Sequence, residues 1–120
     1  MKRLMTFMMM AAFAAMVACS SDTTEIGWRN NVGENINEII WDADNIKWVR
    51  GDLGDSSSGY IDGETTEQKE VSTRISTIYA AYWDGAGYSS STAILETGNS
   101  SYQINEGESV IVTINTIVGM

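Results

Sequence analysis

The strongest constraint on the fold of this chain is the alternation of apolar and polar residues in short segments separated by turn residues. In the segment 109–115, Val110, Val112 and Ile114 fall on one face of an extended chain. Segments rich in β-branched and aromatic residues recur about every 8–12 residues, with Gly, Asn or Asp between them. This pattern predicts short β-strands, and no segment after residue 25 shows the spacing of an amphipathic helix.

We therefore predict an all-β domain over residues 26–120, built as a small antiparallel β-sandwich of the immunoglobulin-like type with about seven strands. A small β-barrel is the alternative. The expected strands are 26–29, 36–41, 46–50, one beginning in 64–70, 71–83, 88–97 and 109–115, with further alternation at Tyr102 and Ile104.

Two turns and one long loop are expected between these strands. The segments 42–45 and 84–87 contain the Asp, Asn and Gly residues that favour turns. The segment 51–63 is rich in Gly, Ser and Asp, which predicts a surface loop with a short strand near Tyr60. The segment 71–83 has apolar residues at both parities, so we expect it to be covered on both faces or to bend between two sheets.

The beginning of the chain has the layout of an export signal. Lys2 and Arg3 precede an apolar run over 4–17, and the chain turns polar directly after Cys19. The run is shorter than the roughly 20 residues that a membrane-spanning helix needs. We therefore expect residues 1–18 to be a signal peptide and residues 19–25 to be a tether.

The sequence Met16-Val17-Ala18-Cys19 resembles the lipobox of bacterial lipoproteins. That resemblance implies cleavage before Cys19, acylation of its thiol, and attachment to the outer membrane or cell surface through the lipid anchor. Each buried methylene of an acyl chain contributes about 0.8 kcal/mol, and lasting attachment needs at least two chains. An ordinary secreted protein with a cysteine near the cleavage site is the alternative.

Charge and composition narrow the partners of the exported part. The formal net charge is −9, and residues 1–18 hold two of the seven basic residues and no acid, so the mature part is more acidic still. Such a chain repels nucleic acid, and we expect no nucleic-acid partner. Because Cys19 is the one cysteine, the mature domain contains no disulfide and depends on packing for its stability.

The residue types available do not favour catalysis. The sequence has no histidine and no second cysteine, which excludes thiol nucleophiles, Ser-His pairs and the usual zinc and copper sites from the mature domain. We therefore predict no enzyme and no cofactor. Asp52, Asp55 and Asp62 are weak candidates for an irregular calcium site, since the loop does not match an EF-hand, and solvated loop acids are the alternative.

The aromatic residues are the remaining candidates for binding. Four tryptophans and five tyrosines suit the core of a domain without disulfides. As the alternative, Trp48 and Tyr60 are exposed beside the 51–63 loop and stack on a sugar or form a protein-binding hot spot.

These observations favour a lipid-anchored envelope protein that acts as a non-enzymatic binding module for a protein or a glycan. A structural envelope lipoprotein without a discrete ligand is one alternative. An acidic inhibitor of a cationic hydrolase such as lysozyme is another, because Ser58-Gly59-Tyr60 resembles a loop of such inhibitors, although their cysteines have no counterpart here.

Overall fold

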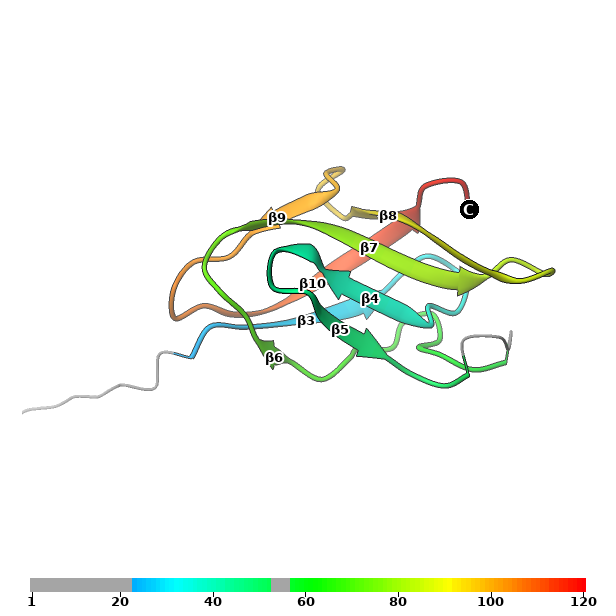
Figure 1. Cartoon of the computed structure of the whole chain (residues 1–120), viewed down its shortest axis with the longest axis horizontal. Helices are drawn as coiled ribbons and strands as arrows, with labels where there is room; N and C mark the ends of the chain where they lie inside the picture. Colours follow the sequence, from blue (N-terminus) through cyan, green and yellow to red (C-terminus); the bar gives the residue numbers. More distant parts are fainter. Residues whose placement is uncertain (1–22, 53–56) are drawn as a thin grey trace, which may run out of the picture.

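The computed structural model describes residues 23–52 and 57–120, which form one curled, open β-sheet of eight strands (Figure 1). The strands are β3 (Glu25–Asn30), β4 (Glu38–Trp41), β5 (Ile46–Val49), β6 (Lys69–Glu70), β7 (Ile75–Trp83), β8 (Tyr88–Leu95), β9 (Ser101–Gln103) and β10 (Ser109–Ile117). The described helical structure is one 3-10 turn, η2 (Asp42–Asp44), where the sequence predicts a turn. The all-β prediction is confirmed, and the half-barrel shape is compatible with a small sandwich or barrel.

The sheet order is β5-β4-β7-β8-β10-β3-β6, and β9 pairs with β7. Every pair is antiparallel except that of β3 with β10, which runs in parallel from Ser109↔Glu25 to Ile114↔Asn30. The expectation of a purely antiparallel arrangement is therefore wrong at this pair. Alternation predicts which face of a strand is buried, but it carries no information about the direction of the neighbouring strand.

Strand β8 connects the two halves of the curled sheet, one containing β4, β5 and β7 and the other containing β3 and β10. Its first part pairs with β7 from Trp83↔Tyr88 to Tyr79↔Thr92. Its last residues, Ala93 to Leu95, pair instead with β10. Strand β9 then pairs with the first three residues of β7, which β8 does not reach. Figure 1 shows the result, with β4, β5 and β7 on one side of the fold and β3 and β10 on the other.

The two edge strands of the open sheet, β5 and β6, are joined by side chains instead of a backbone ladder. The Lys69 ammonium of β6 donates to the carbonyl oxygen of Lys47 in β5 at 2.6 Å. The indole N–H of Trp48 donates to the Glu67 carbonyl oxygen at 2.9 Å. The first contact satisfies a backbone carbonyl at the edge of β5 that would otherwise be open to pairing with another chain.

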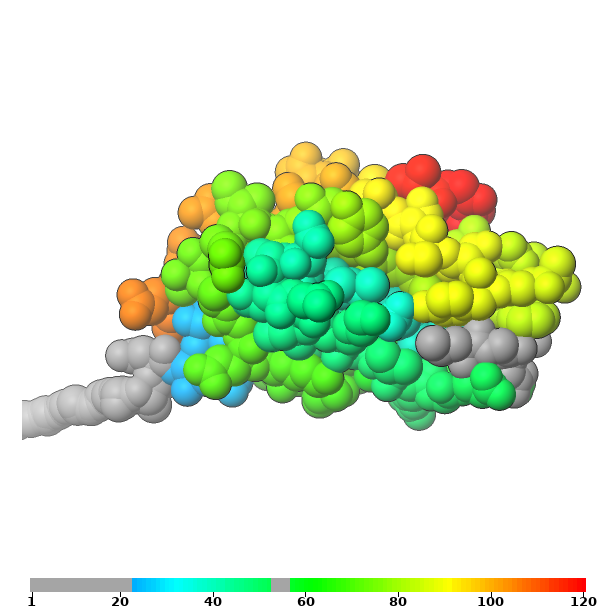
Figure 2. Space-filling model, viewed as in Figure 1, coloured from blue at the N-terminus to red at the C-terminus, as the bar shows by residue number. Residues whose placement is uncertain are grey.

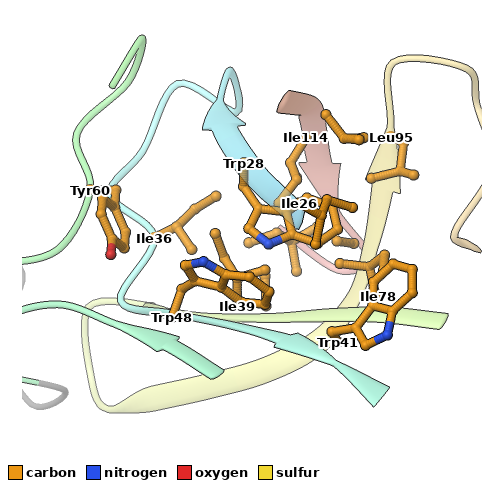
Figure 3. Close-up of a cluster of buried hydrophobic side chains, with 14 of the residues drawn as sticks. Ile26, Trp28, Ile36, Ile39, Trp41, Trp48, Tyr60, Ile78, Leu95 and Ile114 are labelled. Atoms are coloured by element: carbon orange, nitrogen blue, oxygen red, sulfur yellow. The ribbon is translucent and has the colours of Figure 1, made fainter. Parts of the chain in front are cut away.

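The hydrophobic core lies between the two halves of the curl, and tryptophan rings fill its centre (Figure 3). The ring of Trp28 from β3 packs edge-on against that of Trp48 from β5, with centroids 5.6 Å apart and an interplanar angle of 85°. It also lies 6.3 Å from the ring of Trp41 in β4. On β10, Ile114 is fully buried whereas Ile111 on the other face is 40% exposed, as the alternation predicts.

The strand β7 is packed into the core on one face. Ile78, Ala80 and Tyr82 belong to the core cluster. On the opposite face Ala81 is fully buried, but Ile75 is 62% exposed and Trp83 is only half-buried. The expectation that both faces are covered is therefore wrong at the two ends of the strand. Figure 2 shows β4 and β5 at the centre of this outer side, with the β7–β8 hairpin and the C-terminal segment at one end.

No helix in the described ranges has the length and apolar character needed to cross a membrane. Every residue of the core cluster lies between Ile26 and Ile117. The core cluster of the described residues therefore lies within the segment 23–120.

Candidate functional site

Trp48 and Tyr60, the two rings predicted to be exposed, are both in the core. Trp48 is 0% and Tyr60 5% exposed, so the prediction of exposure is wrong and the alternative interpretation as core residues is confirmed (Figure 3). Trp48 is held by its indole hydrogen bond across the β5–β6 edge and lies beneath the Lys69 ammonium, 5.5 Å from the ring centroid. Alternation on β5 could have indicated this, because Trp48 shares one face of the strand with Ile46, which packs against the core.

Tyr60 forms an isolated β-bridge with Ile36 and closes the 51–63 loop onto the core. Its hydroxyl donates to the Glu67 carboxylate at 3.2 Å, and the Arg50 guanidinium lies 5.4 Å from its ring centroid. Burial, together with the negative charge of Glu67, raises the pKa of Tyr60 to about 12. Gly59 beside it is buried, so Ser58-Gly59-Tyr60 serves here to attach the loop to the sheet.

Of the calcium candidates, Asp52 and Asp62 lie in the described residues, and each accepts a hydrogen bond from the protein. The backbone carbonyl of Asp52 accepts a hydrogen bond from the Ser58 hydroxyl at 2.7 Å. The Asp62 carboxylate accepts one from the backbone N–H of Gly33 at 3.1 Å, and Asp55 lies outside the described residues. Within 23–52 and 57–120, no three His, Cys, Asp or Glu side chains form a group that could hold a metal ion.

Trp83 is the tryptophan that the fold leaves partly open to solvent. The other three tryptophans are 0% exposed, whereas Trp83 is half-buried at the end of β7. Its cross-strand partner on the outer face is Tyr88, which is 38% exposed. Sequence reasoning missed Trp83, although its parity in β7, opposite to Ile78, Ala80 and Tyr82, was available as a signal.

The outer face next to Trp83 also holds a buried carboxylate. Glu38 is 8% exposed and accepts a hydrogen bond of 2.5 Å from the Tyr88 hydroxyl. The Lys47 ammonium lies 3.5 Å from the other carboxylate oxygen. Burial, and then the hydrogen bond to Glu38, raises the pKa of Tyr88, so the phenol stays protonated and the contact is retained at neutral pH.

A groove of about 670 Å³ opens beside Trp83 where three segments meet. The segments are the β3–β4 loop, the end of β7 with its turn, and the residues that follow β10. The groove is lined by Gly33, Glu34, Asn35, Tyr82, Trp83, Asp84, Gly85, Gly119 and Met120. Figures 1 and 2 show the β7–β8 hairpin and the C-terminal segment together at this end of the molecule.

The first wall of the groove is fixed by Asn30, which is 1% exposed. Its amide nitrogen donates to the carbonyl oxygens of Glu34 and Tyr60, both at 2.7 Å. Its amide oxygen accepts the backbone N–H of Val32 at 3.0 Å. One buried side chain therefore sets the path of the 31–35 loop relative to the core.

The second wall is fixed by Asp84 in the β7–β8 turn. One carboxylate oxygen accepts the backbone N–H groups of Ala86 and Gly87, at 2.9 and 2.8 Å, and the other accepts the Ser89 hydroxyl at 2.6 Å. The Ser89 contact, followed by the two backbone contacts, lowers the pKa of Asp84. Asp84 is therefore an ionised and well-oriented carboxylate at the edge of the groove.

Comparison of the chain with known proteins gave no match to a family model, to a curated protein or to a solved structure. Cys19 and the signal-like segment before it lie outside the described residues.

Proposed function

We propose that the protein is an exported, lipid-anchored envelope protein whose β-domain is a non-enzymatic binding module for a protein or a glycan. The observation that supports binding is the groove beside Trp83, the one tryptophan that the fold leaves partly open to solvent. Ligand sites are concave, mainly pre-formed, and combine aromatic surface with a few placed polar groups. The groove combines an indole with carboxylates on walls that Asn30 and the β7–β8 turn hold in place.

The support for the anchor comes from the sequence alone. Replacing Cys19 with Ala removes the thiol that the lipobox-like segment would present for acylation. We expect Cys19→Ala to abolish metabolic labelling of the protein with a radioactive or clickable fatty acid, while Ser20→Ala leaves the label in place. Labelling that survives in Cys19→Ala would refute the proposed lipid anchor at Cys19. It would leave the proposal of a binding surface unaffected.

The binding proposal is tested with the soluble domain, residues 23–120. The immobilised domain is exposed to a glycan array and to envelope proteins, in wild-type form and as Trp83→Ala. We expect a ligand that the wild type retains and Trp83→Ala loses. Ile75→Ala is the matched control, because Ile75 is 62% exposed on the same strand and outside the groove. Equal retention by all three proteins would exclude the groove as the binding surface.

A further inference from the structure

The charge of the groove narrows the class of ligand, and this inference rests on the function proposed above. Glu34 and Asp84 stand on opposite walls, and the groove contains no lysine or arginine among its nine lining residues, all of which are described. Glu34 is exposed, and no side chain of the described residues pairs with its carboxylate. The potential in the groove is therefore negative and is not neutralised from within.

The basic residues of the domain do not offset that potential. In the described part of the chain, four of them form ion pairs with acids that lie outside the groove: Lys47, Arg50, Lys69 and Arg74. The fifth, Arg29, is exposed on β3 and does not line the groove. The formal net charge of the chain is −9. Both the acids on the groove walls and the net negative charge of the chain therefore attract a cation that approaches the groove.

The indole of Trp83, with the carboxylates of Glu34 and Asp84 in the same groove, favours an arginine or lysine side chain as the bound cation. A guanidinium or ammonium group over the face of a tryptophan is attracted by the negative face of the ring, and a guanidinium also forms paired hydrogen bonds with a carboxylate. The groove volume of about 670 Å³ exceeds what one side chain fills and lies in the range of sites that hold an extended ligand.

We infer that the groove beside Trp83 binds a cationic peptide segment, with an arginine or lysine side chain over the indole and its charge between Glu34 and Asp84. The groove offers a concave surface for the peptide, and the two carboxylates complement the positive charge of its side chain. The ligand is then a basic stretch of a protein or peptide, and a neutral glycan is the competing outcome.

The test is calorimetric titration of residues 23–120 with N-acetylated tetra-arginine amide and with its uncharged near-isostere, N-acetylated tetra-citrulline amide. We expect binding of tetra-arginine that weakens as salt is raised, and no heat from tetra-citrulline. Glu34→Gln and Trp83→Leu are each expected to weaken binding about two- to fivefold. Asp84 is left unchanged because its carboxylate also holds the turn.

The control variant is Glu96→Gln, which removes the same charge from an exposed turn outside the groove. If Glu96→Gln weakens binding as much as Glu34→Gln, the attraction is general and the inference is overturned. If tetra-arginine gives no binding while maltohexaose binds in a Trp83-dependent manner, the cationic ligand is refuted and the binding module survives. If neither probe binds at the groove and Trp83→Ala loses no ligand in the capture experiment, both proposals fail.

Discussion

At the scale of single residues, one wall of the groove depends on Asn30, which does not line the groove itself. Its amide joins the 31–35 loop to the Tyr60 bridge through two donated hydrogen bonds and one accepted bond. Asparagine is suited to this place because it offers donors and an acceptor on one short side chain. A buried side chain with every polar atom in use also specifies a single loop conformation.

Asn30→Asp tests this role. The carboxylate cannot donate to the carbonyl oxygens of Glu34 and Tyr60, and it places a charge in a site that is 1% exposed. We expect the free energy of unfolding at pH 7 to fall by about 2–4 kcal/mol. Equilibrium unfolding in denaturant measures this change in the free energy of unfolding.

The matched control is Asn31→Asp, which adds the same charge at the exposed neighbouring residue, where the side-chain bond affected is an exposed one of 3.1 Å to the Asn115 amide oxygen. We expect that change to stay within about 0.5 kcal/mol, the usual range of a surface substitution. If Asn30→Asp is as stable as Asn31→Asp, Asn30 does not position the wall of the groove.

At the scale of elements, the segment that attaches the 51–63 loop to the sheet depends on close backbone approach at Gly59. Gly59 has a φ of 101°, and a Cβ placed there would lie 2.7 Å from the Ile36 carbonyl oxygen. This approach allows the paired backbone hydrogen bonds between Ile36 and Tyr60, at 3.0 and 2.8 Å. The bridge in turn brings Tyr60 to the position where Asn30 binds it.

Gly59→Ala and Gly63→Ala form a matched pair. Both glycines have positive φ, but no heavy atom lies within 4 Å of the added Cβ at Gly63. Both substitutions carry the backbone strain of a left-handed residue, about 1 kcal/mol. We expect Gly59→Ala to cost about 1–3 kcal/mol more than Gly63→Ala, because its Cβ also displaces backbone. Thermal unfolding of the two variants checks this, and equal melting temperatures would contradict the close approach.

The elements themselves were largely predictable, because strand existence and the buried face follow from alternation. The segment 109–115 is the clearest case, with Ile114 inside and Ile111 outside on β10. The partners of the strands were not predictable. The parallel pairing of β3 with β10 and the passage of β8 from one half of the curl to the other depend on contacts between residues far apart in the sequence.

At the scale of the whole molecule, the sequence predicts a binding site beside the Gly-rich 51–63 loop, whereas the groove in the structure lies at the far end of β7. Loop composition drew attention to Trp48 and Tyr60, yet closing the curl requires large rings between its two halves, and these rings fill that space. Trp83 remains partly exposed because it lies beyond the core, on the outer face of β7. The groove itself could not be predicted, since its three segments meet only after the sheet has folded.

The proposed binding site requires that Trp83, and not Trp48, is the indole that a ligand can reach. Acrylamide quenching of tryptophan fluorescence in residues 23–120 measures this without any ligand. We expect Trp83→Phe to abolish most of the quenchable emission and Trp48→Phe to leave it in place. Quenching that persists in Trp83→Phe and disappears in Trp48→Phe would contradict the account.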